Sequence, residues 1–402
     1  MSRRISLATP LEITPKIKKA VLDVLASGQF SPAKKVKEFE EKLAELHHAK
    51  HCVFVNSGTD ALRIGLLALK EKYGWKDGDL VLVPSLTFVA TVNVVLQAGL
   101  KPYFVDVGMY DYTMNPWNYG HTNGPKPELS DHWKRVKAII PVQLFGSDCD
   151  SKLYELAKKY NAKVLEDSCE TILNPLWGEI GCHSTYMAHH LVTGVGGFAL
   201  TNDDRLNWIM RSLANHGRDQ AYIPGYQSPK VSRALLERRF KFNRIGYSCR
   251  GTEFEAALGL AQLEDLPKKV GQRRFVASAI TSALQDFEDL ELPKEDCRKN
   301  HTWMMYPIVL KEDAGISKTD LCLRLEDRGI ETREMMPITN QPCYDFLIKP
   351  LRQNQMNWSV ADRINKQGFY IPCHEGLTED DIAWIYESFD LALDKKANLA
   401  YL

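Results

Sequence analysis

Residues 51–62 read His51-Cys52-Val53-Phe54-Val55-Asn56-Ser57-Gly58-Thr59-Asp60-Ala61-Leu62 and predict a strand, a turn and the start of a helix. The first five residues form a short apolar run, and leucines recur on one broad face of a helix expected over residues 60–73. At the turn, Gly58 lets the backbone approach an anion, so that the N–H groups of Thr59 and Asp60 and the helix dipole would face a phosphate. A plain Ser-Gly helix start explains this stretch equally well when it is taken alone.

Strand-like and helical stretches alternate along the first part of the chain. Strands are expected at 80–83, 102–106, 138–142 and 162–167, and helices near 88–98 and at 152–160. Such interleaving predicts an α/β fold with a mostly parallel sheet and helices on both faces, in which ligands bind at the carboxyl ends of the strands.

A smaller α/β unit is expected after about residue 270. A helix expected at 252–266 precedes this unit, which contains a strand at 304–310, a helix at 318–328 and a last helix capped by Thr378. We therefore predict a large domain over residues 1–268 and a small C-terminal domain over residues 269–402.

Composition excludes several classes of protein. Among the 402 residues, 51 Lys and Arg balance 51 Asp and Glu, which argues against a general nucleic-acid or membrane-surface role. The most apolar stretch, 81–100, contains Pro84 and several polar residues, so it predicts a strand, a turn and a helix rather than a membrane span. The nine cysteines form no Cys-x-x-Cys pair, and the N-terminus has no apolar signal core. We expect a cytoplasmic protein with reduced thiols and no metal site.

A second motif, Cys182-His183-Ser184-Thr185-Tyr186-Met187-Ala188-His189-His190-Leu191-Val192-Thr193-Gly194-Val195-Gly196-Gly197, places a serine five residues before a histidine and a Thr-Gly-x-Gly-Gly run after it. A histidine at such a position can move protons near neutral pH. An isolated histidine is more often a structural one, and His190 keeps that interpretation.

Two further candidates follow predicted strands. Asp167 ends an apolar strand, where it could cap a following helix or pair with a cationic ring nitrogen of a ligand. Phe88 lies in Ser85-Leu86-Thr87-Phe88-Val89-Ala90-Thr91 and could stack on an aromatic ligand or belong to the core.

Together these motifs resemble the DegT/DnrJ/StrS sugar aminotransferase family of fold-type I pyridoxal-phosphate (PLP) enzymes, in order and in approximate spacing. Further matches are 139–146, Asn215-His216-Gly217-Arg218-Asp219 and 246–259, so the resemblance covers nearly the whole chain. It implies an aspartate aminotransferase-like fold and a homodimer with shared active sites. It also implies roles in cofactor binding: Ser57, Gly58, Thr59, Ser184 and Ser248 at the phosphate, Asp167 at the pyridine nitrogen, and Phe88 stacked on the ring.

Within the family the chain is most similar to the branch that lacks the Schiff-base lysine, which includes GDP-4-keto-6-deoxy-D-mannose 3-dehydratase. This similarity rests on Ala188-His189-His190, on Glu166-Asp167-Ser168-Cys169-Glu170 and on the basic segment 239–247. His189 stands in the lysine slot and would be the catalytic base. Histidine moves protons but cannot hold PLP covalently.

That branch implies noncovalent PLP and pyridoxamine phosphate (PMP), L-glutamate as amino donor and no iron–sulfur cluster. The implied reaction is 3-dehydration of a nucleotide-linked 4-keto-6-deoxyhexose, which belongs to deoxysugar formation for lipopolysaccharide O-antigen. An ordinary nucleotide-sugar 4-aminotransferase and a PLP-binding pseudoenzyme remain the alternatives.

Basic residues supply candidates for substrate binding. Residues 211–250 hold nine Lys and Arg against two acids, and Arg218, Arg239 and Arg250 either bind a nucleotide diphosphate or form a solvated basic face. Arg333 is a candidate for the carboxylate of the amino donor or for the sugar nucleotide. Two positions depart from the family pattern: Val195 replaces a glutamate, and Ser248 replaces an asparagine that in the family reaches the phosphate of the neighbouring subunit.

Overall fold

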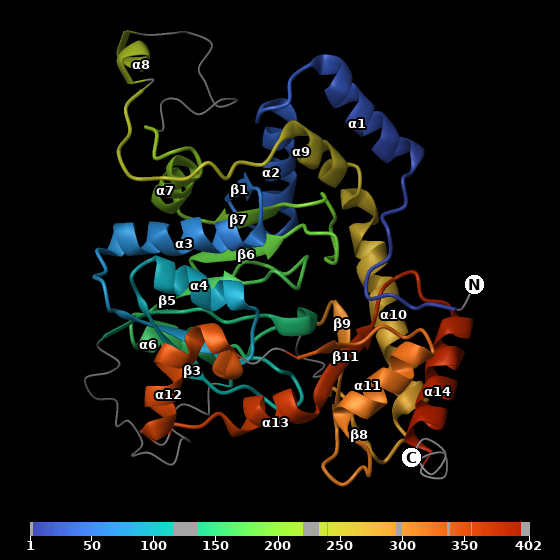
Figure 1. Cartoon of the computed structure of the whole chain (residues 1–402). Helices are drawn as coiled ribbons and strands as arrows, with labels where there is room; N and C mark the ends of the chain where they lie inside the picture. The colour runs from blue at the N-terminus through green and yellow to red at the C-terminus, as the bar shows by residue number, and fades with distance from the viewer. Residues whose placement is uncertain are drawn as a thin grey trace.

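The computed structural model describes residues 3–115, 135–219, 233–238, 240–294, 300–335, 338–354 and 356–394. In this part of the chain a large sheet is layered between helices, and a small sheet lies beside it with helices α10, α11 and α14 (Figure 1). The two sheets correspond to the two α/β patterns of the sequence.

Among the described residues, the large sheet has seven strands. Their order is β1 (His51–Val55), β7 (Gly197–Thr201), β6 (Ile180–Ser184), β5 (Lys163–Asp167), β4 (Val136–Ile139), β2 (Leu80–Pro84) and β3 (Lys101–Val105). Of these described strands, β7 runs antiparallel to its neighbours, β1 and β6, while the other strand pairs are parallel. The predicted α/β class with a mostly parallel sheet is therefore confirmed.

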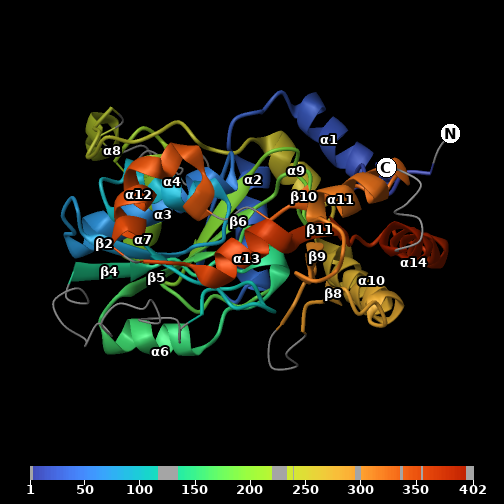
Figure 2. The same cartoon turned by 60° about the horizontal axis from the view of Figure 1, so that its bottom comes forward.

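Helices cover both faces of this sheet, and Figure 2 shows α6 on the side opposite α3 and α4. The side chains of β2 point alternately to these two helical layers. Val81 and Val83 join the core cluster of α3 and α4, whereas Leu80 and Leu82 join that of α6. The helices before residue 262 are α1 (Pro15–Ser27), α2 (Lys34–Leu46), α3 (Gly58–Tyr73), α4 (Val89–Gln97), α6 (Lys152–Lys159), α7 (Asp204–Ala214), α8 (Arg233–Arg238) and α9 (Glu253–Leu260).

The small sheet is antiparallel. Its order is β10 (Arg333–Glu334), β11 (Gly368–Pro372), β9 (Met305–Leu310) and β8 (Leu290–Glu291). The helices of this half are α10 (Leu266–Leu284), α11 (Lys318–Asp327), α12 (Asp345–Gln353), α13 (Ser359–Gln367) and α14 (Glu379–Leu393). As expected, Thr378 caps α14, through a capping box with Asp381.

The domain boundary at residues 268 and 269 stays a prediction. Helix α10 runs across it, since Leu266 and Val270 belong to a core cluster with α2, whereas Val276 and Ile280 belong to the core of the small sheet. No helix within the described ranges is long and apolar enough to cross a membrane.

Two predicted elements were placed incorrectly. The strand expected at 138–142 is β4, which ends at Ile139, and Pro141 lacks the N–H group that a continued strand would need. The helix expected at 252–266 ends at Leu260, and a short 3₁₀ turn precedes α10, which begins with Pro267 in its first turn.

Candidate active site

Asp167 is the buried end of the central strand β5. Its side chain accepts hydrogen bonds from Thr91 Oγ1 (2.7 Å) and from the backbone N–H of Cys169 (3.3 Å), and the residue is 5% exposed. No side-chain ion pair reaches Asp167 within the described ranges, and burial raises the pKa of its carboxyl while the Thr91 hydroxyl opposes that rise. No helix begins directly after Asp167, so it is not a helix cap. A buried carboxyl in this setting could pair with a cationic ligand atom, the second of the two roles expected for Asp167.

Thr91 is a member of the site that the sequence analysis missed. It lies in the first turn of α4, is fully buried, and shares a hydrogen bond of 2.9 Å with Thr87 Oγ1. This short chain of hydroxyl groups orients the Asp167 carboxylate from the side of β2. Two threonines four residues apart at a helix start are the only sequence signal for it.

The turn at Ser57 and Gly58 begins α3 at the carboxyl end of β1. Ser57 Oγ caps this helix by accepting from the N–H of Asp60 (3.1 Å), so the Asp60 N–H is not free for a phosphate as expected. A Cβ atom at Gly58 would lie 2.7 Å from Cys169 Sγ and 2.9 Å from Ser184 Cβ, so only glycine fits here. The structure therefore brings the turn, Ser184 and the segment after Asp167 together.

Ser184 ends β6 beside this turn. It pairs with Gly197 on β7, and its Oγ accepts a hydrogen bond of 3.3 Å from the N–H of Tyr186. Gly197 in turn packs so closely on Ser57 that a Cβ there would lie 2.4 Å from the Ser57 carbonyl carbon. These close contacts explain why the residue after Ser57 and the residue that pairs with Ser184 are both glycines.

His189 lies on the loop between β6 and β7 and is half-buried. Its Nδ1 is buried and has no hydrogen-bond partner among the described residues. Burial lowers the pKa of the imidazole to about 4, opposed by a hydrogen bond with the backbone of Cys169 and assisted by the positive charge of Arg273. The ring is therefore neutral at pH 7 and able to accept a proton.

His190 behaves as the sequence analysis expects of a structural histidine. It is 5% exposed, and its Nε2 lies 3.0 Å from the carbonyl oxygen of Thr302. The two adjacent histidines thus differ in environment, because the hydrogen bond of His190 links the loop to the segment before β9 and His189 makes no such link.

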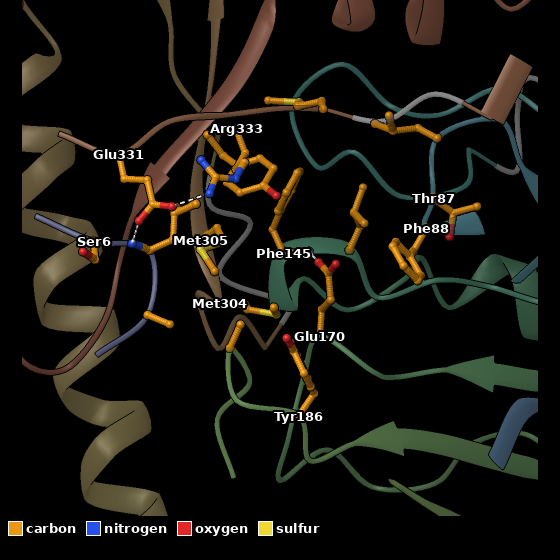
Figure 3. Close-up of a pocket in the computed structure, with 17 residues that line it drawn as sticks. Ser6, Thr87, Phe88, Phe145, Glu170, Tyr186, Met304, Met305, Glu331 and Arg333 are labelled. Atoms are coloured by element: carbon orange, nitrogen blue, oxygen red, sulfur yellow. Dashed lines mark hydrogen bonds and ion pairs between the residues drawn. The ribbon is translucent and has the colours of Figure 1, made fainter. Parts of the chain in front are cut away.

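A cavity of about 590 Å³ lies between the two sheets (Figure 3). Tyr186 and Ala188 line it, whereas Asp167, Ser184 and His189 are not among its lining residues. Phe88 lines it and is 51% exposed, so it is not a core residue. Arg333, on β10 across the cavity, is ion-paired with Glu331 and donates to the carbonyl oxygen of Thr332 (2.7 Å). The predicted ring-stacking residue and one predicted substrate-binding arginine therefore share one cavity.

Two of the other predicted substrate-binding residues, Arg218 and Arg250, lie close enough to interact electrostatically. Arg250 forms a bridge with Val55, its Nη2 lies 3.3 Å from Ser248 Oγ, and burial and the charge of Arg218 lower its pKa. The guanidinium of Arg218 lies 5.0 Å from the ring centre of Phe240 and 5.5 Å from that of Phe242. Arg333 is not part of this basic group, and Arg239 lies outside the described residues.

The protonation of His189 gives a direct test of this environment. We expect the ring to stay neutral as the pH falls from 7 to about 5, because its folded pKa of about 4 lies below the unfolded value of 6.5. The folded state then binds fewer protons than the unfolded state, so the stability contributed by the neutral ring is present above about pH 6.5 and is lost toward pH 4. Histidine ¹⁵N chemical shifts measure this titration, with signals assigned by their loss in His189→Asn. A midpoint near 6.5 would contradict the described environment.

Comparison with known proteins places this geometry in a family. The model of the DegT/DnrJ/EryC1/StrS aminotransferase family matches residues 11–390. The chain is 30% identical to the lipopolysaccharide biosynthesis protein RfbH of Salmonella typhimurium over 91% of this chain and 85% of that protein. It is 29% identical to GDP-perosamine synthase of Caulobacter vibrioides, over 97% of this chain and 98% of that protein.

A solved structure shows the same fold. It is the E. coli GDP-4-keto-6-deoxy-D-mannose 3-dehydratase with bound hydrated PLP, which is 25% identical, covers 97% of this chain and 100% of its own, and superposes with a TM-score of 0.82. The predicted aspartate aminotransferase-like fold and the resemblance seen in the motifs are thereby confirmed. The chain belongs to the DegT/DnrJ/EryC1/StrS aminotransferase family.

Proposed function

We propose that this protein is a PLP-dependent 3-dehydratase of a nucleotide-linked 4-keto-6-deoxyhexose. The observation that carries the proposal is His189, a neutral histidine whose Nδ1 is buried and has no hydrogen-bond partner among the described residues. Such a residue can act as a base but cannot bind PLP covalently. The PLP-bound 3-dehydratase of the same fold supports this choice of cofactor and reaction.

The residues present fit PLP. Asp167 would pair with the protonated pyridine nitrogen, since it is a buried carboxylate that lacks a cation within the described ranges. Gly58 and Ser184, packed together at the start of α3, would hold the phosphate with Ser57 and Thr59. Phe88 would stack on the ring from the cavity side. These contacts would retain the cofactor without a covalent bond.

PLP and PMP supply an electron sink that carries amino groups. The residues of this chain would control the protons: His189 takes and returns the proton at Cα of glutamate and at C4′ of the cofactor. In the balanced reaction, glutamate and the keto sugar give 2-oxoglutarate, ammonia and a 3-deoxy keto sugar. The electron pair that reduces C3 comes from glutamate, and the C3 oxygen leaves as water.

Arginines on two sides would bind the substrates. Arg218 and Arg250 lie close enough for the charge of one to affect the pKa of the other, and a nucleotide diphosphate would neutralise both. Arg333 would bind the carboxylate of the amino donor in competition with Glu331. Ser248, whose Oγ is 3.3 Å from Arg250, would contact the phosphate of a partner subunit if the protein is the homodimer that the resemblance implies.

A nucleotide-sugar aminotransferase is the second candidate, and the 29% identity to GDP-perosamine synthase favours it. The exposed Val195 replaces the glutamate typical of the family, which also leaves the substrate pocket open to other outcomes. The mass of the sugar product separates the two reactions, because an aminotransferase keeps nitrogen on the sugar and a dehydratase releases ammonia.

Replacing His189 by alanine tests its role as base. We expect His189→Ala to lower the rate of 2-oxoglutarate formation from L-glutamate by about 10²–10⁴-fold, the usual contribution of a positioned base, while PLP still binds. Absorption spectra follow PLP and PMP, and mass spectrometry follows 2-oxoglutarate. His190→Asn, which keeps a donor for Thr302, is the control and should retain the reaction. Unchanged turnover in His189→Ala would exclude the base, and a wild type that binds PLP without reacting would favour a pseudoenzyme.

Replacing His189 by lysine tests its position. We expect His189→Lys to form a covalent bond with PLP, because the amine would reach the C4′ aldehyde if His189 occupies the lysine slot. Borohydride reduction followed by intact-protein mass spectrometry detects this bond. Wild type treated in the same way should show no added mass. The absence of an adduct in His189→Lys would mean that His189 does not face the cofactor.

A substitution at Thr91 tests whether Asp167 belongs to the cofactor site. Thr91→Val removes the hydroxyl that donates to Asp167 (2.7 Å) and should weaken PLP binding by about tenfold or more, since a hydrogen bond to a charged group contributes about 1.5–3 kcal/mol. Equilibrium binding of PLP, followed by protein fluorescence, measures the change. Thr87→Val, which touches Thr91 but not Asp167, is the matched control. Equal PLP affinity in Thr91→Val and wild type would remove Asp167 from the cofactor site.

A further inference from the structure

Glu170 is an acidic side chain in the cavity that the proposed mechanism does not yet use. The cavity wall is mostly apolar, with Phe88, Phe145, Met304 and Met305 among its members, and Figure 3 shows Glu170 between Phe145 and Tyr186. Glu331 lines the same cavity but is engaged by Arg333 and by the N–H of Leu7 (3.0 Å). Glu170 has no such cation within the described ranges.

The position of the Glu170 carboxyl is fixed by a strained turn. One of its oxygens accepts a hydrogen bond of 2.6 Å from the N–H of Phe145, whose backbone has the unfavourable φ of 57°. The Phe145 ring is held by Tyr112 and Tyr370, with ring centres 5.6 and 5.5 Å away. Burial raises the pKa of Glu170 to about 7, the Phe145 N–H opposes that rise, and the charge of Asp167 adds to it. A large share of Glu170 is therefore protonated at neutral pH.

Cys169 connects Glu170 with His189. The backbone of Cys169 hydrogen-bonds with the ring of His189, and Glu170 follows Cys169 directly in the chain. Ala188, the residue before His189, and Tyr186 line the same cavity as Glu170. Glu170 therefore lines the cavity together with the residues that lead up to His189 in the chain.

We propose that Glu170 donates the proton with which the C3 oxygen of the sugar leaves as water. This role rests on the proposed 3-dehydratase function. In the step, the C3–O bond breaks and its electron pair stays on oxygen, which takes the proton of Glu170. His189 would take the proton at C4′ of the bound cofactor, and the cofactor would supply the electron pair that replaces the pair lost at C3. Glu170 is left as a carboxylate and regains a proton from water.

A substrate analogue whose leaving group needs no proton separates the protonation by Glu170 from the other steps of the reaction. The glutamate half-reaction should proceed at the wild-type rate in Glu170→Gln, whose amide oxygen can still accept from Phe145. Loss of the C3 hydroxyl should fall by about 10²–10⁴-fold, the contribution expected of a positioned acid. With the 3-deoxy-3-fluoro analogue of the keto sugar, Glu170→Gln should release fluoride close to the wild-type rate, because fluoride is a weak base and leaves unprotonated.

Glu166→Gln is the matched control. Glu166 lies in the same segment, and burial also raises its pKa to about 7, but its carboxyl accepts from the N–H groups of Trp177 (3.1 Å) and Gly178 (2.7 Å) outside the cavity. Glu166→Gln should still eliminate the C3 hydroxyl of the keto sugar and the fluoride of the analogue. Equal losses with hydroxyl and fluoro substrates in Glu170→Gln would overturn the acid role, as would an unchanged hydroxyl reaction. A wild type that releases no fluoride and keeps nitrogen on the sugar would instead refute the 3-dehydratase function itself.

The protein without cofactor provides an independent measurement. The infrared difference spectrum between wild type and Glu170→Gln should contain the carbonyl band of a protonated carboxyl that disappears as the pH rises through about 7. A band already absent at pH 5.5 would mean that Glu170 is ionised and cannot be the donor. The same spectrum with Glu166→Gln as reference separates the two acids.

Discussion

The burial of one carboxyl group at the end of β5 organises this structure. Asp167 lies at the centre of the sheet, where an ionised carboxylate without a cation costs several kcal/mol. The hydroxyl of Thr91 and one backbone N–H offset only part of that cost. The fold keeps the Asp167 side chain at this buried position because strands on both sides of β5 hold its backbone, through Cys182 on β6 and Val142 after β4. A ligand that brings a positive ring nitrogen would complete the site.

The segment that follows Asp167 connects the remaining parts. Cys169 touches the turn at Gly58 and the ring of His189, and Glu170 reaches the turn at Phe145. Phe145 in turn packs on Tyr370 of the small sheet. Within four residues the chain therefore contacts the start of α3, the loop that carries His189, and the second half of the molecule. A change in this segment would move several groups of the site together.

Much of this arrangement could be predicted from the sequence because it depends on local patterns. The sequence predicts the strands β1, β2 and β5 and the Ser-Gly turn before α3, because each is determined by residues close together in the chain. Contacts between distant segments could not be predicted. Thr91, for example, meets Asp167 from 76 residues away. The same limit hid Glu170, which was noted only as part of a motif, because its meaning depends on the cavity that Phe88, Phe145 and Arg333 form around it.

One environment pushes the pKa values of two side chains in opposite directions. Removal from water disfavours the charged form, so it lowers the pKa of His189 to about 4 and raises that of Glu170 to about 7. At pH 7 the imidazole is then neutral and can act as a base, while about half of the Glu170 carboxyl is protonated and can act as an acid. A lysine at position 189 would combine proton transfer with covalent attachment of the cofactor in one group. Histidine gives up the attachment, so the noncovalent contacts at Gly58, Ser184 and Asp167 would have to retain the cofactor, and the neighbouring acid becomes available for a second proton.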